Sequence, residues 1–377
     1  MKPDVLIIGG GVIGLAIAER AQRDGLQTTV LDKGPMGAES SWAGAGMLTC
    51  RPRPRHVPGQ LDYHDLTHYS VSLYREWAAR LFEETGVDTG YRVCGALEVA
   101  LAGFNPNPAR EKTDFNTWAE ACNSRGIRAR VIDAKEAAEL EPNLQREIAG
   151  VLEFPDEAQV RSPWLTRALS ASILKNGGLL KPGIEAADID ICGSSVQGVV
   201  LADGQKISAS RVVVCTGAWT AGLPSLIKIA PRCARIHPVR GQLLCYESER
   251  GLCRRLLTSS GHYIVPREDG VVLVGATQED AGFEKATTPE GLHELEAFAQ
   301  RIVPAFRLKK PAKSWSGLRP GLKGKHPVLG PVPGISGLFV AAGHYRNGFT
   351  LAPATAELVV DSILARKRKI SVEFWAP

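Results

Sequence analysis

The fold is decided near the N-terminus by the stretch Val5-Leu6-Ile7-Ile8-Gly9-Gly10-Gly11-Val12-Ile13-Gly14. Its first four residues form a continuous apolar run, which is typical of a strand buried in a parallel sheet. A helix of small and aliphatic residues follows and ends near Gly25, and residues 28–31 predict a second strand that leads to Asp32. In this context a Gly-x-Gly-x-x-Gly motif predicts a dinucleotide-binding site.

Each glycine of the motif has a separate physical role. Gly9 permits the tight turn, Gly11 lets the backbone approach a pyrophosphate, and Gly14 lets the helix pack closely on the sheet. The helix N-terminus presents N–H groups to phosphate oxygens, and a carboxylate at Asp32 is placed to accept from ribose hydroxyls. The motif by itself does not separate FAD from NAD. In this segment we assign to the cofactor Gly9, Gly11, Val12, Ile13, Gly14, Asp32 and Lys33.

The bulk composition is that of a globular protein with more than one domain. The chain has 377 residues, of which 44% are hydrophobic and 23% charged, and its net charge is +5. Nucleic-acid binding requires a clustered basic face. The densest clusters are residues 366–369, after an apolar helix, and Arg51-Pro52-Arg53-Pro54-Arg55, which we expect to be a stiff surface loop. We therefore expect no nucleic-acid partner; whether residues 51–59 form a lid stays open.

The eight cysteines are scattered, and none forms a CxxC pair. This spacing predicts neither a zinc site nor a disulfide framework, so we expect no bound metal and the reduced thiols of a cytoplasmic protein. The longest apolar runs fall short of the roughly 18 residues that a membrane span needs, so we expect no integral membrane segment. We also expect the protein to form a homo-oligomer.

The predicted elements indicate an α/β fold with two interleaved domains. A Rossmann-like domain is predicted from buried strands at residues 5–8, 28–31, 212–214 and 338–342. An α+β substrate domain built on an antiparallel sheet is predicted from strands at residues 97–101, 242–246, 263–266 and 271–274, with a helix over 289–302. Further helices are predicted over residues 63–84, 162–176 and 354–365, and a hairpin over 196–207. We assign residues 1–85, 150–220 and 320–377 to the cofactor-binding domain, and residues 86–149 and 221–319 to the substrate-binding domain.

Three later segments carry a resemblance to a known family. They are Ser40-Ser41-Trp42-Ala43-Gly44-Ala45-Gly46-Met47-Leu48, Val212-Val213-Val214-Cys215-Thr216-Gly217-Ala218-Trp219, and Gly343-His344-Tyr345-Arg346-Asn347-Gly348-Phe349-Thr350-Leu351-Ala352-Pro353-Ala354-Thr355. Together with the glycine motif they resemble the D-amino-acid oxidase family of flavoproteins over nearly the whole chain. The third segment, with residues 263–267 and 317–321, is most similar to the glycine oxidases of thiamine biosynthesis.

The resemblance implies that the cofactor is FAD, bound in an extended pose with its flavin at the domain interface. The small residues 43–46 let a backbone pass close to a flat ring, and the N-terminus of the last helix would face the flavin pyrimidine and stabilise the anionic reduced flavin. The related sarcosine oxidases tether FAD through a cysteine in a segment that corresponds to residues 320–326, which contain none here, so we expect non-covalent FAD. The cofactor residues in these parts are Ser40, Ser41, Ala45, Gly46, Met47, Val160, Thr216, Gly217, Trp219, Gly343, His344, Tyr345, Arg346, Asn347, Gly348, Phe349 and Thr350.

The resemblance also implies the substrate residues. Arg319 would hold the substrate carboxylate, because a guanidinium fork matches two carboxylate oxygens. Arg346 and Tyr263 correspond to a second arginine and a tyrosine beside the same carboxylate. The sequence departs from the nearest relatives at Gln278, where a methionine is expected, and at Gly261, where a polar residue is expected. Both changes alter the size or polarity of the pocket, so the preferred amine is not fixed by the resemblance.

The implied reaction is oxidative deamination of glycine, or of a small amine such as sarcosine or D-alanine, to an imine, with O2 reduced to hydrogen peroxide in the service of thiazole formation. The substrate gives a hydride to the flavin, so no acid–base residue is assigned. The alternatives are a dehydrogenase that passes electrons to a quinone or carrier, and a non-catalytic flavin-binding protein. An NAD(P)-dependent enzyme is disfavoured because no second Gly-x-Gly-x-x-Gly follows a strand.

Overall fold

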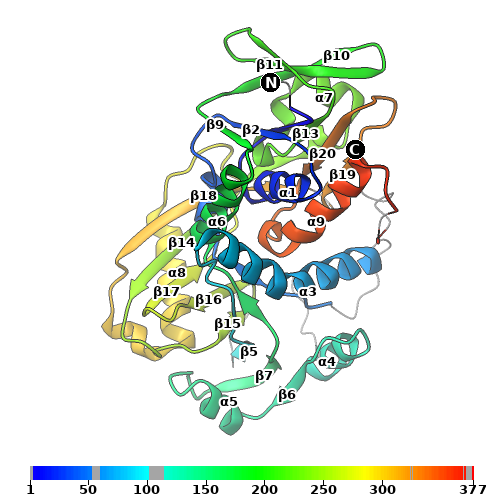
Figure 1. The fold of residues 1–377 in the computed structure, drawn as a ribbon. Coiled ribbons are helices and arrows are strands. Elements are labelled where there is room, and N and C mark those ends of the chain that lie inside the picture. The colour runs from blue at the N-terminus through cyan, green and yellow to red at the C-terminus, as the bar shows by residue number, and fades with distance from the viewer. Residues whose placement is uncertain are drawn as a thin grey trace.

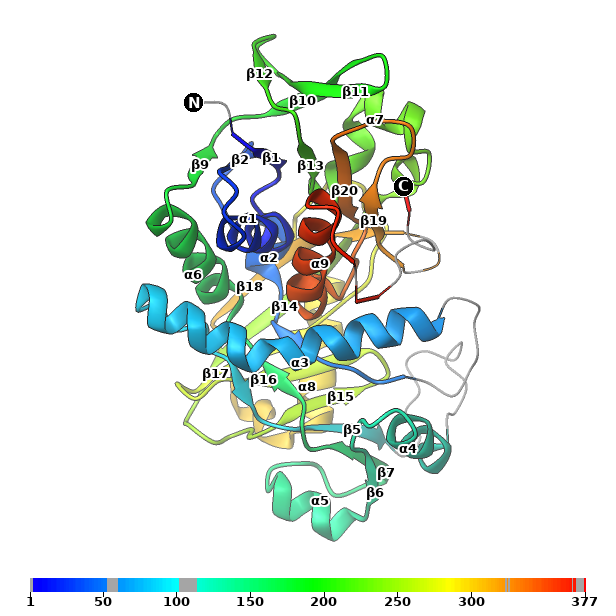
Figure 2. The same cartoon turned by 45° about the vertical axis from the view of Figure 1, so that its right-hand side comes forward.

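The fold is described from a computed structural model. The structure describes residues 3–52, 60–101, 114–322, 324, 326–367, 369–370 and 376–377. Two large sheets occupy the two ends of the molecule, and the long helix α3 (Gln60–Thr85) crosses between them (Figures 1 and 2). No helix within the described ranges is long and apolar enough to cross a membrane.

The first sheet has six strands in the order β19-β20-β13-β1-β2-β9. Neighbouring strands in it pair in parallel, except for the antiparallel pair β19–β20. All four residues of β1 are buried, which is the burial that the continuous apolar run predicts. The strands are β1 (Val5–Ile8), β2 (Thr28–Asp32), β9 (Leu179–Pro182), β13 (Val212–Val214), β19 (Val328–Pro331) and β20 (Leu338–Ala342). The Rossmann-like sheet of the sequence analysis is confirmed.

Three helices pack together beside this sheet, and the first of them depends on a glycine contact. They are α1 (Val12–Arg23), α6 (Ser162–Lys175) and α9 (Gly348–Ile363), with α1 against both of the others and α3 lying across α6 and α9. A side chain at Gly14 would place its Cβ 1.9 Å from the carbonyl oxygen of Gly9, so only glycine allows α1 to pack this closely on the turn. The helix ends at Arg23, and Gly25 follows in a left-handed conformation, as predicted.

Helix α9 begins six residues earlier than the sequence predicts, because its internal proline is accommodated by α3. Pro353 has no N–H, so the carbonyl of Phe349, one turn before it, loses its helical partner. The Tyr74 hydroxyl of α3 donates to that carbonyl, and the Ala354 N–H donates to the Ser70 hydroxyl of α3 over 3.2 Å. Both side chains are fully buried. Helix α3 therefore fixes the start of α9 at Gly348.

The second sheet has eight strands in the order β18-β14-β17-β16-β15-β5-β7-β6. Its pairs are antiparallel, except for the parallel pair β15–β5. Helix α8 (Pro289–Ile302) packs against β14, β16 and β17. The strands are β5 (Ala96–Leu101), β6 (Arg130–Ile132), β7 (Ile148–Phe154), β14 (His237–Glu247), β15 (Leu256–Ser259), β16 (His262–Pro266), β17 (Val271–Gly275) and β18 (Lys313–Gly321). Of these, β6, β7, β15 and β18 were not expected from the sequence.

Smaller elements complete the described chain. The predicted hairpin is confirmed as β11 (Ser195–Leu201) and β12 (Lys206–Ser208), which form a three-stranded sheet with β10 (Ala186–Cys192). A second small sheet joins β3 (Met47–Leu48), β8 (Ala158–Gln159) and β4 (Arg92–Val93). The short helices are α2 (Glu39–Ala43), α4 (Phe115–Asn123), α5 (Ala134–Leu140) and α7 (Pro224–Ile229), with 3-10 turns at Gly217–Gly222, Cys233–Arg235 and Pro304–Leu308.

The division into two interleaved domains remains our proposal. The six-stranded sheet is assembled from the start, middle and end of the chain, and the eight-stranded sheet from the segments between them. Strand β7 spans the proposed boundary at residue 150, and β18 spans the boundary at residue 320. The part of residues 51–59 for which a lid was considered lies outside the described residues from residue 53 onward.

The hydrogen bond from Tyr74 to α9 generates a stability prediction. Tyr74→Phe should lower the free energy of unfolding by about 1–3 kcal/mol, because a buried carbonyl is left without a donor. Tyr246 provides the matched control, since its buried hydroxyl has no hydrogen-bond partner among the described residues. Tyr246→Phe should therefore cost close to nothing. Urea unfolding of the three proteins at saturating FAD measures both changes, and equal effects of the two substitutions would contradict the assignment.

Candidate active site

A cavity of about 760 Å³ lies between the two large sheets. One part of its wall comes from the carboxyl ends of β1, β2, β13 and β20 and from the loops that follow them. The opposite part comes from β14, β15, β16 and β18 of the eight-stranded sheet. Ligands of open parallel sheets bind at the carboxyl ends of the strands, so this cavity is the candidate site.

The structure brings most of the predicted site residues to this one cavity. The predicted residues that line it are Gly9, Gly11, Val12, Ile13, Asp32, Lys33, Ser40, Ser41, Ala45, Gly46, Met47, Thr216, Gly217, Trp219, Tyr263, Arg319, Gly343, His344, Tyr345, Arg346, Asn347, Gly348 and Phe349. Three others lie directly behind the lining, namely Gly14, Val160 and Thr350. Val160 and Thr350 hold the lining loop, because the Val160 N–H donates to the Gly46 carbonyl over 2.8 Å and the Thr350 hydroxyl to the Met47 carbonyl over 3.3 Å. Their individual roles toward a ligand stay predictions.

The glycine turn is held in shape by two side chains. Asp32 accepts from the N–H groups of Gly10, over 2.7 Å, and Gly34, over 2.8 Å. The Val12 N–H, first in helix α1, donates to the Ser41 hydroxyl over 2.9 Å. Burial raises the pKa of Asp32, while these backbone N–H groups lower it. The turn is thus fixed with the N-terminus of α1 directed into the cavity, where it favours an anion.

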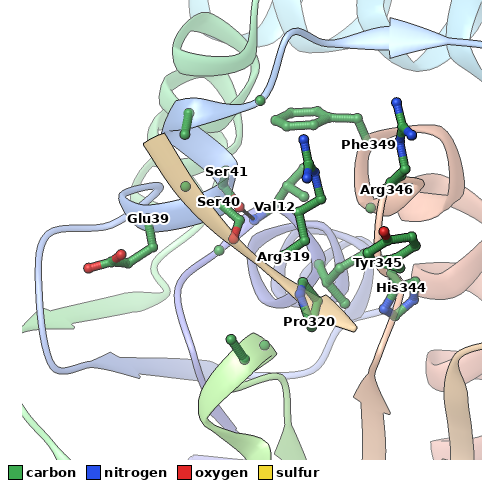
Figure 3. Close-up of a pocket in the computed structure, with 18 of the residues that line it drawn as sticks. Val12, Glu39, Ser40, Ser41, Arg319, Pro320, His344, Tyr345, Arg346 and Phe349 are labelled. Carbon is green, nitrogen blue, oxygen red and sulfur yellow. Dashed lines mark hydrogen bonds between the residues drawn. The ribbon is translucent and has the colours of Figure 1, made fainter. Parts of the chain in front are cut away.

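A loop of small residues forms the middle of the cavity wall. The Ala45 carbonyl accepts from Arg267 over 2.6 Å, and the Gly44 carbonyl accepts from the Ser162 hydroxyl over 2.6 Å. A Cβ at Gly44 would lie 3.2 Å from the ring of Phe349, which stands in the first turn of α9. The loop and the N-terminus of α9 therefore border the same space, as Figure 3 shows around Phe349.

Two arginines and a tyrosine meet at the end of the cavity formed by the eight-stranded sheet. Arg319 from β18 and Arg346 from the loop before α9 extend their guanidinium groups toward the Phe349 side of the cavity (Figure 3). Arg319 donates to the Thr277 carbonyl over 3.0 Å, and Arg346 donates to the Gly261 carbonyl over 2.9 Å. Tyr263 from β16 lines the same end. This end is therefore suited to a carboxylate.

Two glycines make room for these side chains. A Cβ at Gly241 would lie 2.1 Å from an Nη atom of Arg319, and a Cβ at Gly275 would lie 2.6 Å from the Tyr263 hydroxyl. Burial lowers the pKa of Arg319, and neighbouring Arg346 lowers it further, whereas the Tyr263 hydroxyl acts in the opposite direction. A carboxylate placed between the two cations would relieve their repulsion, which is the electrostatic reason for expecting one there.

Sequence reasoning missed several residues of the cavity, and it misplaced one. Arg51 was expected on a surface loop, but its guanidinium is buried and bound to Glu98, Glu157 and Thr258. The local Arg-Pro alternation gave no sign of these partners, which come from distant strands and turns. The lining residues with polar or aromatic side chains that the sequence left unassigned are Glu39, Thr49, Arg51, Tyr63, Glu98, Trp118, Glu185, Cys215, Thr258, His262 and Gln278. No group of three or more histidine, cysteine or acidic residues in the described chain is arranged to hold a metal ion.

Comparisons with known proteins give one consistent result. The family model described as FAD dependent oxidoreductase matches residues 4–362. The chain is 32% identical to a glycine oxidase of Pseudomonas aeruginosa, covering 100% of this chain and 99% of that protein. It is 33% identical to a bifunctional ThiO/ThiG protein of Trichormus variabilis, over 97% of this chain and 53% of that protein. A solved glycine oxidase from Geobacillus kaustophilus superimposes with a TM-score of 0.90 at 30% identity, covering 100% of this chain and 98% of that one.

His344 generates a prediction about acid stability. It is buried in the cavity wall, with Nε2 3.1 Å from the Thr355 hydroxyl, and burial lowers its pKa to about 3. An unfolded histidine has a pKa near 6.5, so the unfolded state binds a proton that the folded state does not, and stability falls as the pH drops below about 6.5. Between pH 7 and pH 5, the free energy of unfolding of the wild type should therefore fall by about 2 kcal/mol more than that of His344→Gln.

Urea unfolding at each pH, with FAD in excess, measures this difference. Between pH 7 and pH 8 the histidine is neutral in both states, so the stabilities of the two proteins should change in parallel. Identical losses of stability between pH 7 and pH 5 would show that His344 is not kept neutral by the fold.

Proposed function

The chain belongs to the family of FAD-dependent oxidoreductases, and on that basis we propose that it oxidatively deaminates glycine or a similar small amine such as sarcosine or D-alanine. The observation that carries the proposal is the pair Arg319 and Arg346 beside Tyr263, in the same cavity as the dinucleotide turn. The guanidinium of Arg319 is desolvated, and a second cation close to it is unfavourable unless an anion joins the two. The α-carboxylate of an amino acid is such an anion.

FAD is the cofactor of this enzyme family, and the cavity fits it. The N-terminus of α1 lies at one part of the cavity and suits the pyrophosphate, with Asp32 and Lys33 beside it for the adenosine half. The N-terminus of α9 at Gly348 suits the electron-rich part of a flavin, and the small residues 43–46 leave room for its ring. When bound, FAD supplies the acceptor for the two electrons that leave the substrate.

The protein's own groups would align the substrate. Arg319 and the Tyr263 hydroxyl would hold its carboxylate, and Arg346 would close the site from the α9 side. His344 would contribute a neutral ring, since burial keeps it unprotonated. The two sheets on either side would exclude water from the reacting carbon. No acid–base residue is assigned, in keeping with hydride transfer from a neutral amine.

The finer parts of the proposal concern the electron acceptor, the fate of the product, the attachment of FAD and the cellular location. We propose that O2 is reduced to hydrogen peroxide and that the imine serves thiazole formation, as the ThiO/ThiG relatives suggest. We propose non-covalent FAD, because among the eight cysteines, all of them in the described chain, only Cys215 lines the cavity, and burial raises its pKa so that it stays a neutral thiol. We also propose that the protein is cytoplasmic and forms a homo-oligomer.

An amine panel tests the function. The purified yellow protein should release hydrogen peroxide in air with at least one of glycine, sarcosine and D-alanine, measured by a peroxidase-coupled assay. Flavin bleaching by substrate under anaerobic conditions, without peroxide in air, would replace the oxidase by a dehydrogenase that uses a quinone or carrier. Absence of bleaching with every amine would contradict the proposal.

Arg319 provides the mutational test. Arg319→Ala should reduce kcat/KM by on the order of 30- to 1,000-fold, because a charged, two-point contact worth about 2–4 kcal/mol is lost. Arg319→Lys should recover only part of this loss, since it restores the charge but not the fork. The flavin absorbance of both variants should match the wild type, because Arg319 is assigned to the substrate. Unchanged kinetics in Arg319→Ala would remove it from the site.

A further inference from the structure

The cavity has a second charged group, at a distance from Arg319. Glu98 of β5, Thr258 of β15 and the guanidinium of Arg51 line the same cavity as the substrate residues. The indole of Trp118, on α4, lines this part as well. Figure 2 shows β5 and β15 in the lower half of the molecule, beside β16, which carries Tyr263. The carboxylate of Glu98 therefore belongs to the site, although the proposed reaction makes no use of it.

Arg51 holds two carboxylates at once. Its Nε and one Nη donate to the two oxygens of Glu157 over 2.6 and 2.5 Å, and its other Nη donates to Glu98 Oε2 over 2.9 Å and to the Thr258 hydroxyl over 2.7 Å. The Thr258 hydroxyl donates to the same Glu98 oxygen over 2.5 Å. The guanidinium also lies 4.4 Å from the centre of the Phe154 ring. Arg51 thus binds both carboxylates, and together with Thr258 it fixes the orientation of Glu98.

Among the residues that the structure describes, the charges of this cluster do not cancel. The guanidinium of Arg51 faces two carboxylates, Glu98 and Glu157, so these described groups together carry one excess negative charge in a largely buried place. Glu157 does not line the cavity, whereas Glu98 does. Both hydrogen bonds that Glu98 makes with side chains of the described chain end on Oε2. A buried excess charge is costly, so the cluster favours a cation in the cavity beside Glu98.

The pairing of the strands gives the separation of the two charged ends. Glu98 pairs with Thr258, and Thr258 pairs with Tyr263, so the three residues form one row across the sheet and face the same side. Two strand spacings separate Glu98 from Tyr263, which is about 10 Å between their Cα atoms. The Tyr263 ring leans further away, over Gly275. Glycine, held by its carboxylate at Arg319, cannot reach Glu98.

We propose that Glu98, with Thr258 and Arg51, is a binding site for a cationic side-chain group, so that the enzyme's substrate class extends to amino acids with an amino or guanidinium group at the end of a methylene chain. This inference rests on the proposed function. The carboxylate end binds at Arg319 and Tyr263, the methylene chain runs along the sheet past Trp118, and the distal cation pairs with Glu98. The reaction at the α-carbon is unchanged: two hydrogens leave the substrate, and O2 becomes hydrogen peroxide.

The first experiment compares charged and neutral analogues on the wild-type holoenzyme. Each enantiomer of lysine and ornithine is assayed for peroxide beside norleucine, which has a similar chain but no distal charge. The basic amino acid should show roughly tenfold or higher kcat/KM over norleucine, as expected for one hydrogen bond to a charged group. No preference for the basic amino acid would overturn the proposal.

The second experiment assigns the preference to Glu98. Glu98→Gln keeps the shape of the side chain and removes its charge, and it should abolish most of the preference while changing the norleucine rate by less than about threefold. Glu153→Gln is the matched control, because Glu153 is a buried carboxylate paired with arginines but lies on the opposite face of the same sheet, in register with Leu97. A preference that persists in Glu98→Gln, or that falls equally in Glu153→Gln, would overturn the assignment. If Glu98→Gln fails to fold, Glu98→Asp takes its place. Aspartate retains the negative charge beside Arg51 but has a shorter side chain, so the preference for the basic amino acid should fall partially.

A binding measurement separates this inference from the proposed function. 6-Aminohexanoate and hexanoate carry the two end groups without an α-amine, so neither can be oxidised. Calorimetry on the holoenzyme should show tighter binding of 6-aminohexanoate, by roughly tenfold, and Glu98→Gln should bind both alike. If no amine supports turnover but this difference is present, the proposed function fails while the cation site stands. Equal binding of the two acids by the wild type would remove the cation site even if glycine is oxidised.

Discussion

The site depends on one desolvated arginine that joins the eight-stranded sheet to the loop of small residues. Arg267 stands just beyond β16 and donates to the carbonyls of Ala45 and Val160 and to the side chain of Gln159. Burial lowers the pKa of Arg267 to about 10, which still leaves it charged at neutral pH. The substrate-binding strand β16 is thereby tied to the small-residue loop that borders the cofactor space. Arg267 thus helps to fix the position of Tyr263 relative to the loop, and a displacement of about 1 Å is enough to cost a catalytic site much of its rate.

The cavity is organised by charge as much as by shape. Two helix N-termini and the side chains of Arg319 and Arg346 supply positive charge along its wall, whereas Glu98 supplies a carboxylate beside Arg51. The positive groups suit phosphates, a reduced flavin and a carboxylate. Family membership accounts for the phosphate and flavin positions. The identity of the amine depends on the remaining groups, since one fold supports many substrates and the site decides among them.

Short sequence patterns predicted those elements of the fold whose structure is determined within a short segment of the chain. The apolar run before Gly9 and the spacing of its glycines predicted β1, the turn and α1, and the segment from Gly343 placed a loop and helix against the same cavity. Strand β18 was missed because Gly317, Pro320 and Gly321 interrupt its pattern, and long-range pairing with β14 overrides that local signal. The early start of α9 was missed because the donors that accommodate Pro353 belong to α3.

Arg51 shows most clearly what local sequence patterns do not predict. It begins the alternating stretch Arg51-Pro52-Arg53-Pro54, which favours an exposed loop, but its partners Glu98, Glu157 and Thr258 are 47, 106 and 207 residues away. A charge of this kind can be buried only because the folded chain brings opposite charges to it, and no window of sequence contains that information. Among the described residues, the same long-range assembly leaves the second carboxylate without a cation of its own. A buried imbalance is costly to keep, so it is most simply understood as a place for a ligand whose charge completes the cluster.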